Sequence, residues 1–162
     1  MRTLLIAILM CCVSAAAYAA DGHGGPQMLR ANVDLGNTES LQRGARLFVN
    51  YCVSCHSANY MRYGRVAADL GIPDDVVKAN MMFTTDKIGD PMRIAMKPED
   101  AEAWFGVAPP DLSVVARSRG PDWLFSFLNG FYVDPAKATG VNNVYFPNTA
   151  MPHVLWELQG LN

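Results

Sequence analysis

Residues 51–58 read Tyr51-Cys52-Val53-Ser54-Cys55-His56-Ser57-Ala58. The two cysteines lie three positions apart, and a histidine directly follows the second one. At the start of a helical turn, two thiols at this spacing can each add to one vinyl group of the same haem. His56 is then held beneath the iron, where an imidazole nitrogen can ligate it. The motif therefore predicts one covalent haem c, attached through Cys52 and Cys55.

Three other kinds of site contain cysteine pairs of this kind. A zinc site needs four tetrahedral ligands, and the sequence has no second cysteine pair beyond residue 55. A thioredoxin-like redox pair belongs in a background of alternating strands and helices, which the sequence does not predict. A structural disulfide would leave the adjacent His56 unexplained. Haem attachment accounts for all three residues.

The first nineteen residues have the pattern of a secretory signal peptide. Arg2 precedes an apolar run over residues 4–13 that is too short to span a bilayer, which disfavours a retained anchor helix. Ala17-Tyr18-Ala19 fits the small-residue cleavage pattern, so we expect cleavage after Ala19. Cys11 and Cys12 would leave with the signal, and Cys52 and Cys55 would remain in an exported chain of residues 20–162.

Periodicity and helix-breaking residues predict a helical chain. Leu41, Ala45, Phe48 and Cys52 share one face of a helix over about 38–51, which delivers the motif. Further helices are expected at 98–105, 111–118 and 121–129, with shorter ones starting at Pro73 and spanning 154–158. Residues 131–150 are expected to form a loop, and no segment has strand periodicity. These features predict a small all-α fold that encloses the haem.

Composition places few further limits on function. The chain has 162 residues, a formal net charge of −2 and 51% hydrophobic residues, which suits one domain with one core. The absence of a basic balance argues against a nucleic-acid-binding protein. No apolar run after the signal approaches the roughly 20 residues of a spanning helix.

The sixth position of the iron decides what a haem protein does. The candidates for this position are Met61, Met81, Met82, Met92, Met96, Met151 and His153. Most methionines fill gaps in a core. Met151 stands out because Pro152 restricts the backbone beside it, in a loop far along the chain from His56. We therefore expect Met151 to be the ligand, ahead of His153, because His/Met ligation suits a high-potential electron carrier.

Several blocks of the sequence resemble bacterial cytochrome c1. They are Leu41-Gln42-Arg43-Gly44-Ala45, the motif with Tyr60-Met61-Arg62-Tyr63, Ala108-Pro109-Pro110-Asp111-Leu112-Ser113, Ala116-Arg117-Ser118-Arg119-Gly120 with Asp122-Trp123-Leu124, and Met151-Pro152-His153-Val154-Leu155-Trp156-Glu157-Leu158-Gln159-Gly160. The Pro-Pro-Asp-Leu-Ser and Met-Pro blocks are more specific than the cysteine motif alone. The resemblance implies a class I cytochrome c-like domain of the cytochrome c1 type.

The resemblance also implies roles for single residues. Cys52 and Cys55 would hold the haem, and His56 and Met151 would be its axial ligands. Pro109 and Pro110 would lie against the haem edge. Arg119 would pair with a haem propionate, as a guanidinium can do bidentately; the alternative is a solvated charge at a helix end.

By the same resemblance, the chain is the haem subunit of the ubiquinol–cytochrome c reductase, or bc1 complex. It would lie with cytochrome b on the periplasmic side of a bacterial inner membrane, take an electron from the Rieske iron–sulfur protein and pass it to cytochrome c. It would be no enzyme on its own and would bind no nucleic acid and no small-molecule substrate. The sequence itself adds acidic residues that would help to attract a basic cytochrome c, the alternative being ordinary solvated surface charges: Asp74, Asp75, Glu99, Asp100 and Glu102.

Two alternatives remain open: a freely diffusing periplasmic cytochrome carrier, and a haem enzyme with an open sixth site. Members of the family continue into a membrane-anchor helix, whereas this chain stops at Leu161-Asn162. We therefore expect a fragment that lacks its C-terminal end.

Overall fold

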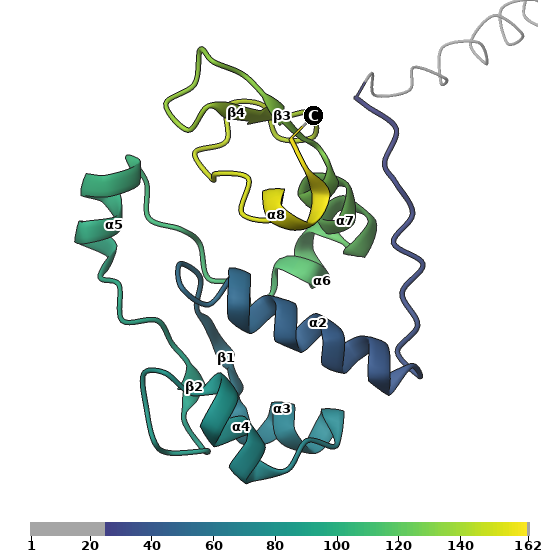
Figure 1. The fold of residues 1–162 in the computed structure, drawn as a ribbon, viewed down its shortest axis with the longest axis vertical. Coiled ribbons are helices and arrows are strands. Elements are labelled where there is room, and N and C mark those ends of the chain that lie inside the picture. Colours follow the sequence, from purple (N-terminus) through teal and green to yellow (C-terminus); the bar gives the residue numbers. More distant parts are fainter. Residues whose placement is uncertain (1–24, 162) are drawn as a thin grey trace, which may run out of the picture.

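The computed structural model describes residues 25–161, a chain of short helices with two small sheets (Figure 1). The predicted signal segment, with Cys11 and Cys12, lies outside the described residues. The helices are α2 (Thr38–Tyr51), α3 (Tyr63–Leu70), α4 (Asp74–Met81), α5 (Pro98–Phe105), α6 (Val115–Arg119), α7 (Pro121–Asn129) and α8 (Trp156–Gln159). The strands are β1 (Ala58–Arg62), β2 (Pro91–Met92), β3 (Phe131–Val133) and β4 (Val141–Asn143).

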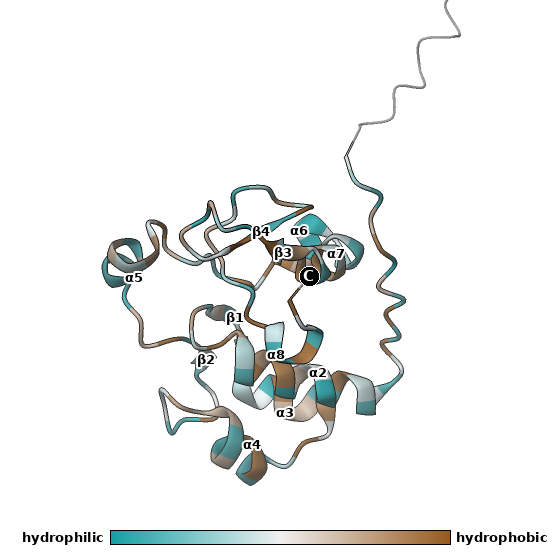
Figure 2. Cartoon of the chain, turned by 45° about the horizontal axis from the view of Figure 1, so that its top comes forward, coloured by the Kyte–Doolittle hydropathy of each residue, from teal (hydrophilic) through white to brown (hydrophobic). Residues whose placement is uncertain are grey.

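Helix α2 leads directly into the cysteine motif. The Asn37 side chain caps its start by accepting the N–H of Ser40 at 2.9 Å. Hydrophobic and hydrophilic residues alternate along the helix (Figure 2), and Val49 is buried while Ala45 and Phe48 pack against the core. The predicted bounds, 38–51, are confirmed.

Helix α2 packs with α3, α4 and the β1–β2 ladder to form the N-terminal half of the molecule. Strand β1 runs antiparallel to β2, and Ala58 pairs with Met92. The core of this half consists of Val49, Val53, Ala58, Tyr63, Ala67, Val77, Met81 and Met92. Two of the candidate sixth ligands, Met81 and Met92, are therefore core residues.

The C-terminal half, residues 115–161, is built around α7 and an antiparallel hairpin. Phe131 pairs with Asn143, and Val133 with Val141, in the β3–β4 ladder. The ring of Phe127 stacks on Trp123 with 5.2 Å between centroids and meets Phe131 edge-on at 5.3 Å. Trp123, Phe127 and Phe131 thus form the aromatic core of this half.

The fold is mainly helical, but the two small sheets make the prediction of an all-α fold wrong in that respect. The predicted loop over 131–150 contains the β3–β4 hairpin. Strands of three residues are too short to display an alternating pattern, and every residue of β4 is buried. Pairing of this kind depends on the partner strand and leaves little signal in the local sequence.

The helices predicted at 98–105 and 121–129 are confirmed, and α4 begins directly after Pro73 as expected. The helix predicted at 111–118 is shorter: α6 begins at Val115, because the Asp111 carboxylate accepts the N–H of Ser113 and holds a turn there. The last helix lies at 156–159 rather than 154–158. Helix α3 was not predicted; no side chain caps its start.

Among residues 25–161, no helix has the length and apolar character that crossing a membrane requires.

Candidate haem site

The Cys52–His56 segment forms one additional turn after α2. The N–H of Cys52 donates to the Phe48 carbonyl at 2.9 Å. The N–H groups of Cys55 and His56 both donate to the Cys52 carbonyl, at 3.0 and 2.9 Å. Both cysteines are half-buried free thiols. The turn thus holds two thiols and the imidazole on one short, hydrogen-bonded segment.

The orientation of the His56 ring is set by a distant segment. Its Nδ1 lies 2.7 Å from the carbonyl oxygen of Pro110, fifty-four positions away in the sequence. A carbonyl only accepts hydrogen bonds, so Nδ1 carries the proton and Nε2 keeps its lone pair. A second group that binds the far nitrogen in this way orients a histidine for a metal. In the neutral ring, this contact leaves Nε2 as the nitrogen that a metal could use.

Asp111 fixes the segment that supplies this carbonyl. Its carboxylate accepts hydrogen bonds from the backbone and side-chain nitrogens of Asn59, each at 2.8 Å, and from the N–H of Ser113 at 2.9 Å. The N–H of Leu112 donates to the Ser57 carbonyl at 2.8 Å. The Pro-Pro segment is thereby tied to the residues that follow His56. Asp111 lies within the Pro-Pro-Asp-Leu-Ser block but was not predicted to be a site residue.

Burial would by itself raise the pKa of Asp111, but the hydrogen bonds from Ser113 and Asn59 outweigh burial and hold this pKa below its usual value. Asp111 is therefore a carboxylate at neutral pH.

The electrostatics of Cys52 bear on the redox-pair alternative. Burial raises the pKa of the Cys52 thiol, and the neighbouring Cys55 raises it further. A dithiol that works by exchange needs a lowered pKa, because the thiolate is its nucleophile. The raised pKa favours the thiol form of Cys52 over the thiolate, which argues against a role in thiol–disulfide exchange.

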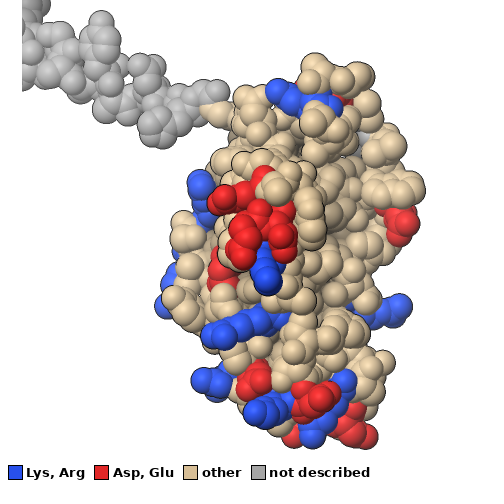
Figure 3. Space-filling view, turned by 90° about the vertical axis from the view of Figure 1, so that its left-hand side faces the viewer, with Lys and Arg blue, Asp and Glu red and all other residues tan. Residues whose placement is uncertain are grey.

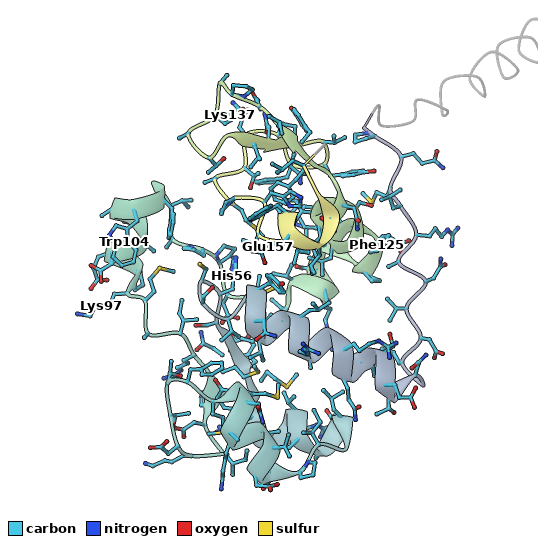
Figure 4. The ribbon with its side chains drawn as sticks, in the orientation of Figure 1. His56, Lys97, Trp104, Phe125, Lys137 and Glu157 are labelled. Carbon is cyan, nitrogen blue, oxygen red and sulfur yellow. The ribbon has the colours of Figure 1, made fainter. Side chains whose placement is uncertain are left out.

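Figure 4 shows His56 in the loop after α2, on the side of the molecule where α5 and the C-terminal half lie. Met151 belongs to that C-terminal half; it is half-buried, and its N–H donates to Thr149 Oγ1 at 3.3 Å. If His56 and Met151 both ligate the iron of one haem, they need no contact with each other. Pro109 is half-buried and Pro110 is exposed, next to the His56 ring.

Arg119 lies at the end of α6 and is exposed. The carbon at the centre of its guanidinium group lies 5.0 Å from the centroid of the Trp123 ring, which is a cation–π geometry. This contact presents the guanidinium group on the aromatic core of the C-terminal half. Pairing with a propionate stays a prediction.

His153, the second candidate for the sixth position, is only 6% exposed and packs within the C-terminal half. Its ring stacks on Phe131 with 5.0 Å between centroids and 7° between planes. Its Nε2 donates to the Gly160 carbonyl at 3.1 Å, and among the described residues its buried Nδ1 has no hydrogen-bond partner. The ring is engaged in packing, which favours Met151 over His153 as the ligand.

A thiol pair on a helical turn, an imidazole with a free Nε2 and a mainly helical fold are the features of a c-type cytochrome. The chain belongs to the Cytochrome C1 family, whose model matches residues 32–159. The chain is 48% identical to the cytochrome c1 of Allochromatium vinosum, over 99% of this chain and 65% of that protein. It is also 48% identical to a Nitrosomonas europaea protein named ammonia monooxygenase gamma subunit, over 98% of this chain and 66% of that protein.

A plant relative is more distant. The mitochondrial protein of Arabidopsis thaliana named cytochrome c1 1, heme protein, is 30% identical over 72% of this chain and 46% of its own length. The chain thus spans less than two thirds of the length of these relatives. The name of this relative describes a haem protein, in agreement with the cofactor predicted from the Cys-x-x-Cys-His motif.

Proposed function

We propose that this chain is the haem-carrying, electron-transferring subunit of a bc1 complex. The observation that carries the proposal is the 2.7 Å hydrogen bond from His56 Nδ1 to the Pro110 carbonyl, next to the two free thiols. This hydrogen bond orients the imidazole of His56, the residue that the motif predicts as an iron ligand. Membership in the cytochrome c1 family supports the same assignment.

The residues fit one haem c. The thiols of Cys52 and Cys55 would hold it covalently, and His56 Nε2 and the Met151 sulfur would be its axial ligands. When bound, the haem supplies one-electron redox chemistry. The chain itself would keep the imidazole of His56 oriented and offer a sulfur ligand that raises the reduction potential. It would also cover the edge of the haem with Pro109 and Pro110. Arg119 would neutralise a propionate.

We infer the partners from the family. The subunit would lie beside cytochrome b, receive an electron from a Rieske iron–sulfur protein and pass it to cytochrome c. Figure 3 shows a group of acidic side chains on the side where α5 lies, and α5 contains Glu99, Asp100 and Glu102. Such a group favours the approach of a basic partner. Export by a signal peptide of residues 1–19 would place the haem domain on the periplasmic side of the membrane.

The test uses the chain matured in a bacterial periplasm, where haem is attached. We expect the oxidised protein to show the weak sulfur-to-iron charge-transfer band in the red region, and the reduced protein to resist carbon monoxide. Met151→Ala should abolish the band and admit carbon monoxide, because it removes the only proposed sulfur ligand. Met61→Ala is the matched control, since Met61 is 39% exposed and was also a candidate.

If the Met61→Ala variant loses the band and the Met151→Ala variant keeps it, the ligand assignment is wrong. An unmutated protein that binds carbon monoxide readily would favour a haem enzyme with an open sixth site. Loss of covalent haem in the double variant Cys52→Ala/Cys55→Ala, judged by protein mass after denaturation, tests the attachment separately.

A further inference from the structure

Two neighbouring asparagines lie in the core of the C-terminal half. Asn142 and Asn143 belong to β4 and are 6% and 1% exposed. Burying a side-chain amide costs free energy unless its polar atoms find partners. The partners of these two amides therefore indicate what they do in the fold.

Asn143 joins α7 to the segment that follows β4. Its Nδ2 donates to the Phe127 carbonyl at 2.7 Å, near the end of α7. Its Oδ1 accepts the backbone N–H groups of Tyr145 at 2.9 Å and Phe146 at 3.1 Å. One buried side chain thus binds one helix-end carbonyl, which also accepts the N–H of Gly130 at 3.1 Å, and satisfies two loop N–H groups.

Asn142 repeats this arrangement farther along the same loop. Its Nδ2 donates to the Asp134 carboxylate at 3.0 Å. Its Oδ1 accepts the N–H of Asn148 at 2.8 Å and that of Asn143 at 2.9 Å. Asn148 has a positive φ of 63°, in the left-handed region that asparagine adopts more often than most residues, and Lys137 donates a hydrogen bond to its side chain. The two asparagines therefore fix the loop at residues 145, 146 and 148.

Met151 lies between this fixed loop and a second anchor. Before it, the buried Thr149 accepts the Met151 N–H through Oγ1. After it, the His153 ring stacks on Phe131, the residue that pairs with Asn143 across the hairpin. The backbone on either side of Met151 is thus tied to the same hairpin.

We propose that Asn142 and Asn143 are positioning residues that hold Met151 in place as the sixth ligand of the haem iron; this rests on the proposed function. A thioether is a neutral, weak ligand, so its bond to iron survives only if the loop that carries it is already ordered. The asparagines supply that order through hydrogen bonds from their buried side-chain amides to the loop backbone.

The variants Asn142→Ala and Asn143→Ala, made in the full chain matured in a periplasm, test the proposal. The matched control is Asn80→Ala on α4: the Asn80 side-chain amide also donates to a backbone carbonyl, that of Val76 at 2.8 Å, but it is exposed and lies in the other half. The readouts are the sulfur-to-iron band, carbon monoxide binding to the reduced protein, and the covalent haem content.

We expect each β4 variant to lose most of the band and to bind carbon monoxide while keeping its covalent haem, because Cys52 and Cys55 lie in the other half. The control should behave like the unmutated protein. If both β4 variants keep the band and resist carbon monoxide, the positioning role is wrong although Met151 is the ligand. If Met151→Ala leaves the band intact, the ligand assignment is wrong, and the positioning role falls with it.

If neither variant folds and acquires haem, amide hydrogen exchange in the unmutated haem protein tests the proposal instead. The amides of Tyr145, Phe146 and Asn148 should then exchange as slowly as those in the middle of α2, because each is held by a buried acceptor. Exchange of these three amides at the rate of an exposed loop would overturn the proposal.

Discussion

At the scale of single residues, the candidate site depends on a carboxylate that is not one of the proposed iron ligands. Asp111 receives hydrogen bonds from Asn59 and Ser113, and so it holds the segment whose Pro110 carbonyl orients His56. These hydrogen bonds favour the ionised carboxyl, and the pKa of Asp111 is therefore lowered in the folded protein. A group with a lowered folded pKa stabilises the fold above its unfolded pKa, and this contribution is lost as the pH falls through the folded value.

Asp111→Asn should therefore lower the free energy of unfolding at neutral pH. The difference from the unmutated protein should stay constant down to the ordinary carboxyl pKa of about 3.9. Below that pH it should shrink, because the unmutated protein loses the contribution of its carboxylate. Urea unfolding midpoints at a series of pH values measure the effect.

The control for this measurement is Asp86→Asn, which changes an exposed carboxylate between α4 and β2. A difference between Asp111→Asn and the unmutated protein that grows as the pH falls would contradict the assigned direction of the pKa shift.

At the scale of elements, the junction of α7 with β3 leaves no space for a side chain. A Cβ added to Gly130 would lie 2.6 Å from Cδ2 of Tyr145, 3.0 Å from the Ser126 carbonyl oxygen and 3.1 Å from Oδ1 of Asn143. Two of these neighbours belong to the hairpin and its loop. The closeness of the α7 end to the segment after β4 is therefore what requires glycine here, since its φ of −97° is open to any residue.

Gly130→Ala should destabilise the protein by about 1–3 kcal/mol, the usual effect of overpacking a filled site. Gly44→Ala is a control of opposite sign. Gly44 lies inside α2, is exposed, and an added Cβ would meet nothing within 4 Å. Alanine should stabilise that helix by about 1 kcal/mol. Urea unfolding of both variants measures the two effects. A Gly130→Ala variant that is as stable as the unmutated protein, or more stable, would show that the neighbouring atoms move aside at little cost.

At the scale of the whole molecule, the N-terminal segment ties the C-terminal half together before the chain enters α2. This segment runs down one side of the molecule (Figure 1). The N–H of Leu29 donates to Ser126 Oγ at 2.7 Å, and the N–H of Ala31 donates to Asp122 Oδ1 at 2.9 Å. Tyr145 donates its hydroxyl proton to the Gln27 carbonyl at 3.0 Å. Residues 27–31 therefore bridge α7 and the loop after β4.

Ser126→Ala should weaken this connection, because Ser126 is fully buried and its hydroxyl is the acceptor for the Leu29 N–H. We expect a loss of about 1 kcal/mol in the free energy of unfolding and faster proteolytic cleavage within residues 25–34. Ser118→Ala is the control, since the exposed Ser118 hydroxyl donates only to Val115 in its own helix. An unchanged cleavage rate in Ser126→Ala would mean that other contacts hold the segment.

The local sequence was sufficient for several features. The bounds of α2, α5 and α7 follow from apolar spacing and from glycine or asparagine near their ends. These signals all lie within one or two turns of the helix end that they mark. The Cys52–His56 turn was predictable for the same reason, since all its chemistry lies within five residues. The blocks around Pro109–Ser113 and Met151–Gly160 were enough to identify the family, which the matching family model confirms.

Only the tertiary structure decided how these parts meet. The tautomer of His56 depends on a carbonyl fifty-four positions away, and Arg119 meets Trp123 because α6 and α7 turn about Gly120. The β3–β4 hairpin and the roles of Asn142 and Asn143 also escaped prediction. A helix forms its hydrogen bonds within its own segment, and its residue pattern is therefore visible in the local sequence. Short strands and buried side-chain amides bond to backbone groups far away in the sequence, so no periodic pattern in their own segment reveals these partners.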